Sequence, residues 1–263
     1  MQNKTAIITG SGMGYKEGGP SIGGSIAMRL SKDGYNIVVV DLYETGQKTV
    51  ELIKTKGGEA IFVQADVTKN NDVELIIKTT KETFGGLHCL VNAVARYSPG
   101  MMKNIVEISD EEWNTTLEVN LNGYFKMAKY AIPFILESGG GTVINISSIE
   151  SLVALSNFGV YSVSKAAIDA LTRSIAVDFS PNIRANSVLP GFVKIANSEN
   201  DRSPEELQKW YAGIAQGYPM KRVCEPDEIA NVVSFLAGKE SSYINGQAIV
   251  VDGGKLVCDQ HTF

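Results

Sequence analysis

The stretch Thr5–Leu30, TAIITGSGMGYKEGGPSIGGSIAMRL, decides the fold of this chain. A short apolar run, Thr5–Thr9, leads directly into Gly10 and a glycine-rich segment. Apolar residues then recur at every fourth position from Ile22, as on one face of a helix, and Ser21 stands where an N-cap is needed. This order of strand, glycine turn and helix predicts a phosphate-cradling turn. On glycine content alone, a surface loop is the competing interpretation.

Short β-branched runs alternate with longer segments of helical period along the rest of the chain, which is typical of βαβ units. The sequence therefore predicts an α/β fold of the doubly wound, Rossmann-like kind, with a seven-stranded parallel sheet flanked by helices on both faces. Two long helices are expected, over 110–137 and 158–179. No linker or repeat interrupts the pattern, so residues 1–263 are expected to form a single domain.

The composition excludes several classes of protein. A net charge of -5 without blocks of like charge argues against nucleic acid or a membrane surface as partner. The scattered residues Cys89, Cys224, Cys258, His88 and His261 form neither a disulfide framework nor a metal site, so we expect no metal. The first residues do not resemble a signal peptide, and no apolar run is long enough to span a membrane, which favours a cytoplasmic location.

Asp41 ends the second expected strand and carries the cofactor hypothesis. A carboxylate at this position can accept hydrogen bonds from both hydroxyls of an adenosine ribose and repels a 2′-phosphate, so NAD is favoured over NADP. A strand-ending turn residue is the alternative interpretation. Lys16, inside the glycine-rich segment, could instead reach a phosphate, which keeps NADP as the second choice.

The motif YSVSK places Tyr161 and Lys165 four residues apart, on one face of an expected helix. A neighbouring ammonium stabilises a phenolate, which makes a tyrosine usable for proton transfer. Ser148 lies at the end of the strand TVINIS, at the edge where open parallel sheets bind ligands, and its hydroxyl could bind a substrate oxygen. The alternative interpretations are an ordinary pair on a helix surface for Tyr161 and Lys165, and a strand-ending turn for Ser148.

With these motifs in place, the chain resembles the short-chain dehydrogenase/reductase family over nearly its whole length. The matching segments occur in the family's order: TG and SIGGSIA, ADV, LVNA, VNLNG, NISS, YSVSK, LPG and INGQAIVVDGG. The resemblance implies a catalytic tetrad of Asn120, Ser148, Tyr161 and Lys165. Tyr161 would be the general acid/base and Ser148 would orient the substrate oxygen. Lys165 would hold the nicotinamide ribose and lower the tyrosine pKa, while Asn120 would anchor a proton-relay water.

The resemblance also implies the residues that bind the cofactor. Asp66 and Val67 would flank the adenine, Asn92 would support the sheet beside the cofactor, and Val193 would lie near the nicotinamide amide. The complete expected set is Gly10, Ser21, Ile22, Asp41, Asp66, Val67, Asn92, Lys165, Pro190, Gly191 and Val193.

The sequence departs from the family pattern in three places, one of which is Ile195, near where the family usually has a threonine after Pro-Gly. Ten residues separate Gly10 from Ser21, and Ser21 replaces the middle glycine of the usual turn. A Ser-Ile opening after a lengthened loop also resembles the enoyl-reductase branch, although that branch spaces its tyrosine and lysine more widely. After the fourth strand the chain reads NAVA, so Ala93 and Ala95 stand where the family commonly has asparagine and glycine. We expect altered loop geometry here.

Substrate recognition in the family comes from the loops after the fourth, fifth and sixth strands. Arg96, Glu150 and Phe192 are the candidates in these loops, with a variable substrate segment over 192–220, and each charged residue could equally be solvated. The expected function is NAD-dependent interconversion of a secondary alcohol and a ketone. Enoyl-type reduction and non-catalytic nucleotide binding are the alternatives. The resemblance further implies a homo-oligomer, a tetramer or a dimer.

Overall fold

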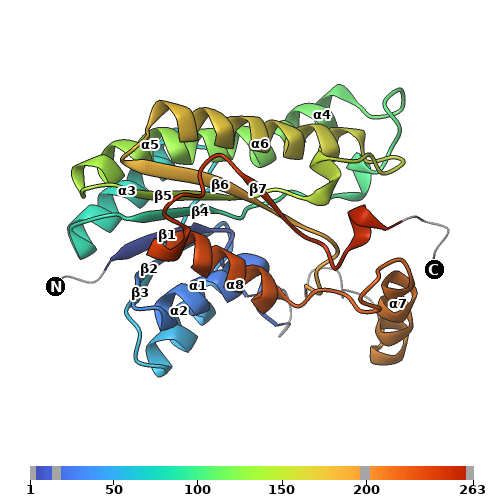
Figure 1. Ribbon diagram of the computed structural model, residues 1–263, viewed down its shortest axis with the longest axis horizontal. Helices are drawn as coiled ribbons and strands as arrows, with labels where there is room; N and C mark the ends of the chain where they lie inside the picture. Colours follow the sequence, from blue (N-terminus) through green and yellow to red (C-terminus); the bar gives the residue numbers. More distant parts are fainter. Residues whose placement is uncertain (1–3, 14–18, 196–201, 259–263) are drawn as a thin grey trace.

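The computed structural model describes residues 4–13, 19–195 and 202–258, and contains one parallel sheet with the strand order β3-β2-β1-β4-β5-β6-β7 (Figure 1). The strands are β1 (Thr5–Thr9), β2 (Asn36–Asp41), β3 (Ala60–Gln64), β4 (Cys89–Asn92), β5 (Gly141–Ile146), β6 (Ile183–Pro190) and β7 (Ala248–Val251). The α-helices are α1 (Ile22–Lys32), α2 (Thr45–Thr55), α3 (Asn70–Phe84), α4 (Asp110–Leu117), α5 (Gly123–Glu137), α6 (Gly159–Asp178), α7 (Pro204–Gln216) and α8 (Pro226–Ala237). The expected seven-stranded parallel sheet is confirmed.

Helix α1 begins where the sequence predicts it. The Ser21 side chain caps the helix by accepting a hydrogen bond from Gly24 N at 3.0 Å, which satisfies one of the free N–H groups of the first turn. Ile26 and Leu30 are fully buried against the sheet. The chain then turns at Gly34, whose φ of 91° lies in the region that glycine adopts readily, and enters β2.

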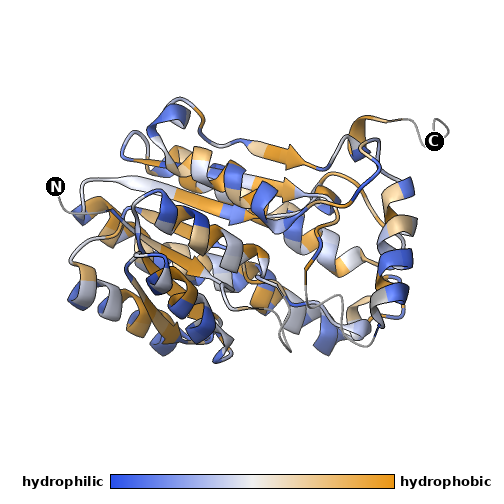
Figure 2. Ribbon diagram, turned by 90° about the horizontal axis from the view of Figure 1, so that it is seen from below, coloured by the Kyte–Doolittle hydropathy of each residue, from blue (hydrophilic) through white to orange (hydrophobic). Residues whose placement is uncertain are grey.

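Two helical layers cover the sheet, and each layer has its own core. Helices α1, α2 and α8 pack on one face, where side chains such as Ile8, Val39 and Ile144 are buried. Helices α3, α5 and α6 pack on the other face against residues such as Ile7 and Val143. Figure 1 shows these two layers below and above the sheet, and in Figure 2 most strands are coloured as hydrophobic while the helices are of mixed character. Burial on both faces explains why the strands are continuously apolar.

The sheet changes direction of winding at β1, which pairs with β2 on one side and with β4 on the other. In open parallel sheets the carboxyl ends of the strands on either side of such a point form a ligand crevice. Helix α7 lies apart from the two layers, at this end of the sheet (Figure 1). The fold therefore locates the candidate site among the loops that follow the strands.

The expected helical segment over 110–137 is present, but it is not α-helical throughout. Residues Glu118–Asn122 form a π-helical segment (η2) between α4 and α5. A π segment is wider than an α-helical turn and is often found at functional sites. It contains the buried Asn120, whose side chain is thereby turned toward the loop that follows β4.

No helix among the described residues is both long and apolar enough to cross a membrane. Three cysteines, Cys89, Cys224 and Cys258, are free thiols.

Gly23 offers a test of how tightly the first turn is packed against α1. A Cβ at this position would lie 2.3 Å from the Gly10 carbonyl oxygen, so Gly23→Ala forces backbone apart and is expected to lower the free energy of unfolding by about 1–3 kcal/mol. Gly213, inside α7, has no atom within 4 Å of the same position. Gly213→Ala should raise stability by roughly 0.5–1 kcal/mol. Urea unfolding of both variants measures the difference, and equal effects would contradict the packing argument.

Candidate active site

The glycine turn after β1 is built around the Ser21 hydroxyl. Gly10 has a φ of 62°, which turns the chain sharply at the end of the strand. Ser21 Oγ lies 2.7 Å from Gly12 O and 3.2 Å from Gly10 O, so the serine ties the turn to the helix that it caps. Ile22 is the first residue of α1. The substitution of serine for the middle glycine thus supports the turn from within, while Lys16 lies outside the described residues.

Two carboxylates follow the next strands. Asp41, the last residue of β2, accepts a hydrogen bond from Gly12 N at 2.8 Å, which places its carboxylate against the glycine turn. Asp66 follows β3. Burial alone would raise the pKa of Asp66, but hydrogen bonds from the Thr68 hydroxyl and backbone N–H bring it below its ordinary value. Both groups are therefore held in position by short local contacts.

Two further residues of the expected cofactor set, Val67 and Asn92, follow or end the neighbouring strands. Val67 is buried against Gly123, where a Cβ would come within 2.8 Å of its Cγ2. Asn92 ends β4 and donates from Nδ2 to Asn145 Oδ1 at 2.9 Å. Its own Oδ1 is buried and has no hydrogen-bond partner in the part of the chain that the structure describes.

The loop after β6 carries Pro190, Gly191 and Val193. Gly191 N donates to Val251 O at 3.0 Å, which holds the start of this loop against β7. Val193 is buried and forms an isolated parallel bridge with Cys224. The loop is thus anchored at both ends of its first turn before it continues into residues 196–201, which lie outside the described residues.

These residues fit a nicotinamide dinucleotide. The backbones of Gly10 and Gly23 lie so close together that a side chain at Gly23 would not fit between them. This close approach lies next to the N-terminus of α1, where free backbone N–H groups favour the binding of phosphate. Asp41 lies beside that turn, at the position suited to a ribose. The donor set along the carboxyl edge of the sheet therefore matches the shape and charge of such a cofactor.

Asn120 connects the π segment to the loop after β4. Its Oδ1 accepts a hydrogen bond from Arg96 N at 2.6 Å, and its Nδ2 lies 3.4 Å from Ser164 Oγ on α6. Since the side chain is fully buried, both contacts are shielded from water. Asn120 therefore links three segments around the site.

Ser148 and Tyr161 lie close together. Ser148 lies two residues beyond β5 and caps the short 3₁₀ turn Ile149–Ser151 (η3), while Tyr161 belongs to the first turn of α6. The Ser148 hydroxyl lies near enough to the Tyr161 phenol to lower its pKa. Ser148 Oγ also donates to the Glu150 carboxylate. The structure thus brings together a phenol, a hydroxyl and a carboxylate.

Lys165 lies one turn beyond Tyr161 on α6 and is 1% exposed. Its Nζ donates to Ile146 O at 2.9 Å and lies 5.5 Å from the centroid of the Tyr161 ring. Burial lowers the pKa of Lys165 to about 8. An ammonium held in this way forms a fixed donor at the end of β5.

Burial is the largest influence on the pKa of Tyr161, which Lys165 is expected to lower. Burial raises the tyrosine pKa above its ordinary value, and the charge of Glu150 raises it further, while the hydrogen bond with Ser148 acts in the opposite direction. The Lys165 ammonium is engaged with a backbone carbonyl instead of the phenol. Desolvation of the phenolate is thus the largest of these effects on the pKa of Tyr161.

Three residues were expected to contact substrate. The Arg96 guanidinium is paired with Glu112 on α4, so its backbone, not its side chain, contacts Asn120. Glu150 contacts Ser148 and faces the tyrosine. Phe192 packs edge-to-face on Trp210 of α7, with ring centroids 5.3 Å apart.

Aromatic residues that sequence reasoning did not single out lie around Tyr161, Lys165 and Phe192. The rings of Tyr97 and Phe158 lie 6.3 Å and 6.2 Å from that of Tyr161, both in edge-to-face geometry. Tyr218 OH accepts a hydrogen bond from Phe192 N at 2.9 Å. Tyr124 is buried beneath Lys165, 5.8 Å from its Nζ. These aromatic residues lie in loops and helices whose sequences contain no distinctive motif, so the sequence alone did not indicate them.

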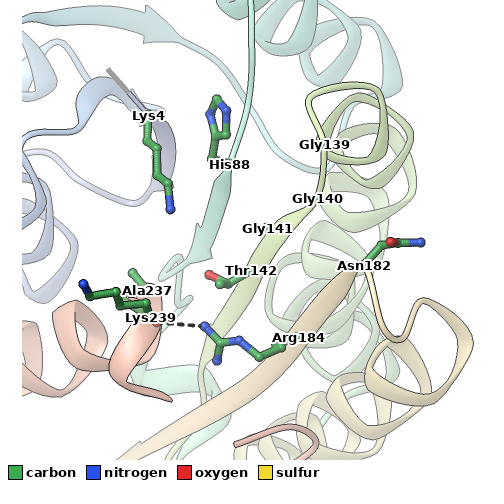
Figure 3. Close-up of a pocket in the computed structure, with 11 residues that line it drawn as sticks. Lys4, His88, Gly139, Gly140, Gly141, Thr142, Asn182, Arg184, Ala237 and Lys239 are labelled. Atoms are coloured by element: carbon green, nitrogen blue, oxygen red, sulfur yellow. Dashed lines mark hydrogen bonds between the residues drawn. The ribbon is translucent and has the colours of Figure 1, made fainter. Parts of the chain in front are cut away.

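A cavity of about 270 Å³ opens at the opposite edge of the sheet and is lined by Lys4, His88, Arg184 and Lys239 (Figure 3). The Arg184 guanidinium donates to three backbone carbonyls there, among them Leu236 O at 2.9 Å. It therefore closes the end of α8 and does not belong to the candidate site. Among the described residues, no group of three or more His, Cys, Asp or Glu side chains could hold a metal ion.

Fold and site together define a Rossmann-type oxidoreductase. Residues 19–255 match the family described as Enoyl-(Acyl carrier protein) reductase. A protein of Thermotoga maritima named "Uncharacterized oxidoreductase" is 40% identical over 96% of this chain and 97% of its own length. The cyclohexanol dehydrogenase of Acinetobacter sp. is 34% identical over 95% and 94%. The ligand-free aldohexose dehydrogenase of Thermoplasma acidophilum is 30% identical, covers 98% of this chain and 96% of its own, and superposes with a TM-score of 0.86.

The chain belongs to the short-chain dehydrogenase/reductase family, an oxidoreductase family that uses nicotinamide cofactors.

The buried ammonium of Lys165 makes stability depend on pH. Below pH 8 the lysine is charged in both states, and the folded state bears the cost of its desolvation. As pH rises from 8 toward 10.5, the unfolded chain binds a proton that the folded chain does not, so the folded state gains stability. Between pH 8 and pH 9.5, the free energy of unfolding of wild type should therefore rise by about 1.5 kcal/mol relative to that of Lys165→Met.

Urea unfolding at the two pH values measures this gain. The matched control is Lys56→Met, which removes an exposed lysine and should leave the difference from wild type unchanged. A constant difference between Lys165→Met and wild type would show that the ammonium is not desolvated in the folded state.

Proposed function

We propose that this protein is an NAD-dependent dehydrogenase that interconverts a secondary alcohol and a ketone. The observation that carries the proposal is that Tyr161 lies near the Ser148 hydroxyl and one helical turn from a buried Lys165. This group lies at the same edge of the sheet as the glycine turn after β1. The substrate carbon would therefore react between a proton-transfer group and the cofactor cradle.

Tyr161 transfers the proton in this mechanism. In the oxidation of an alcohol, its phenolate oxygen takes the hydroxyl proton while the carbon–hydrogen bond breaks and the carbonyl forms. In ketone reduction, the phenol returns that proton to the carbonyl oxygen. The nicotinamide, when bound, accepts or supplies the hydride. Ser148 Oγ holds the reacting oxygen during both directions, which stabilises the charge that develops on it.

Lys165 and Asn120 keep this arrangement in place. The Lys165 ammonium sits 5.5 Å from the Tyr161 ring centroid and provides positive charge on the cofactor side of the phenol. Because the ammonium is nearly completely buried, its interaction with a ribose hydroxyl or a phenolate is little screened by water. Asn120 is hydrogen-bonded to the loop after β4 and to α6, so it fixes the distance between these walls and would anchor a proton-relay water.

Relatives of this chain support carbonyl and alcohol chemistry. One is named for the oxidation of cyclohexanol and a structural neighbour for that of aldohexoses, both of which carry secondary or hemiacetal hydroxyls. The matching family's description names an enoyl reductase, the second candidate. The four-residue spacing of Tyr161 and Lys165 favours the first. Activity on an unsaturated thioester with none on cyclohexanol or cyclohexanone would favour the second.

NAD is proposed over NADP because of Asp41. Its carboxylate is fixed beside the glycine turn by Gly12 N, at the place where a 2′-phosphate would bring a second negative charge. The described part of the turn between residues 10 and 13 offers no cation to offset it. We further propose a cytoplasmic location, where the three free thiols stay reduced.

A homo-oligomer is proposed from the outer faces of α5 and α6. Phe125 and Val163 are 49% and 45% exposed on these helices, and Val177 is 78% exposed. Apolar side chains that a monomer leaves in water are typical of an interface between copies of one chain.

Tyr161→Phe tests the proton-transfer role. Removing one hydroxyl preserves the ring contacts with Tyr97 and Phe158, so folding and cofactor affinity are expected to stay within about twofold of wild type. Turnover of cyclohexanol with NAD should fall by about 10²–10⁴-fold because general acid/base catalysis contributes that much. Steady-state kinetics and a cofactor titration are the two measurements. Retained turnover would exclude Tyr161 as the proton-transfer group.

Asp41→Asn tests the cofactor choice. The amide keeps an oxygen that can accept from Gly12 N but removes the negative charge. Wild type is expected to bind NADH more tightly than NADPH, and the variant should narrow the ratio of the two dissociation constants by about tenfold or more, as expected for relief of like-charge repulsion. Fluorescence titration with each reduced cofactor measures both constants. Tighter binding of NADPH by wild type would overturn the assignment.

A further inference from the structure

A carboxylate lies directly on the hydroxyl that is proposed to orient the reacting oxygen. Glu150 follows Ser148 by two residues, in the η3 turn. Ser148 Oγ donates its proton to Glu150 Oε2, and Glu150 N lies 3.4 Å from the same hydroxyl. The other carboxylate oxygen, Oε1, has no hydrogen-bond donor among the described residues. One strong acceptor next to Ser148 thus has capacity for a further donor.

Three segments of the chain place tyrosines within electrostatic range of this carboxylate. Glu150 raises the pKa of Tyr161 on α6, of Tyr97 in the loop after β4, and of Tyr218 in the loop after α7. Glu150 is hydrogen-bonded to Ser148, and the Tyr97 and Tyr161 rings are in edge-to-face contact with each other. Glu150 therefore lies where the loops expected to recognise substrate converge, not on the outer surface of η3.

The surroundings of Glu150 favour a neutral hydrogen-bond donor over a charged group. A carboxylate or phosphate on the substrate would meet the like charge of Glu150 without compensation. A substrate ammonium would meet the Lys165 ammonium, which Glu150 already stabilises. A hydroxyl avoids both costs, because it donates to the carboxylate and brings no charge. The aromatic rings of Tyr97 and Phe158 supply apolar contact for the carbon atoms of such a substrate.

The spacing of the two groups suggests where that hydroxyl is. Ser148 Oγ and the Glu150 carboxylate are themselves hydrogen-bonded, so a substrate oxygen on the serine has the carboxylate as its neighbour. The two oxygens of a vicinal diol are separated by roughly a hydrogen-bond distance as well. A diol can therefore place its reacting oxygen on Ser148 and its second hydroxyl on Glu150.

We propose that Glu150 is a specificity-determining residue that selects alcohols with a second hydroxyl on the carbon next to the reacting one. The substrates are vicinal diols in oxidation and α-hydroxyketones in reduction. This inference rests on the proposed alcohol dehydrogenase function. A monofunctional alcohol brings apolar carbon against the half-buried Glu150 carboxylate and binds less well, since an acceptor that loses water without gaining a donor is costly.

The test compares two alcohols that differ only in the second hydroxyl, cyclohexanol and trans-1,2-cyclohexanediol, with NAD. The value of kcat/KM is measured for both with wild type, Glu150→Gln and Glu150→Ala. Wild type should prefer the diol. The ratio of kcat/KM for diol to that for cyclohexanol should fall by about tenfold or more in both variants, as expected when a hydrogen bond to a charged group is lost. Glu51→Gln, which removes an exposed carboxylate on α2, should keep the wild-type ratio.

The pH profile gives a second readout that a purely structural role of Glu150 would not move. Four titratable side chains lie near the Tyr161 phenol. They are Glu150 in η3, Tyr97 in the loop after β4, Tyr124 on α5, and Lys165 on the same helix as Tyr161. Since Glu150 raises the tyrosine pKa, both variants should show the rise of kcat/KM for cyclohexanol oxidation at lower pH than wild type.

The outcomes separate this inference from the proposed function. A lower diol preference together with the shifted profile supports it, with circular dichroism and NADH affinity confirming that the variants fold. An unchanged ratio, while wild type oxidises cyclohexanol, overturns the role of Glu150 and leaves the dehydrogenase function standing. If wild type binds NADH but oxidises neither alcohol, the proposed function itself fails and the inference fails with it.

Discussion

All seven strands run in the same direction, and this constraint places the whole candidate site. Parallel strands must be connected by crossovers, so every strand ends at one edge and every loop that follows a strand lies there. The glycine turn after β1, the Asp41 carboxylate after β2 and the Ser148 hydroxyl after β5 are far apart in sequence but share that edge. Helices cover both faces, so the edge is where polar groups meet solvent. The amino-terminal edge has its own cavity, lined in part by Arg184, whose guanidinium closes the end of α8 (Figure 3).

The chemistry at this edge depends on opposite charges held in a poorly solvated place. Lys165 is buried and its pKa is lowered to about 8, so a proton on this side chain is bound only weakly. Glu150 acts in the other direction and raises the pKa of both Lys165 and Tyr161. Under the proposed function, a phenol that is kept protonated suits donation to a carbonyl, and the same phenol would act as a base with the Lys165 ammonium nearby. The site thus contains the groups for proton transfer in both directions.

Local sequence signals predicted local structure well and long-range contacts only in part. The Ser21 cap, the start of α6 near Phe158 and all seven strands agree with the pattern of the chain. The π segment that holds Asn120 was missed because its sequence continues a helical period without a break. The salt bridge of Arg96 with Glu112 was missed as well, since a partner 16 residues away leaves no mark in local periodicity.

The sequence by itself determined the strand and helix order and the family, because hydrophobic periodicity, capping residues and short motifs are properties of neighbouring positions. Only the tertiary structure decided the pKa shifts and the charge contacts of the candidate site. Burial depends on what packs above a side chain, and the aromatic residues around Tyr161 come from distant loops. The raised pKa of Tyr161 and the contact of Glu150 with Ser148 therefore emerge only when the chain is folded, because desolvation and charge proximity are set by three-dimensional distance.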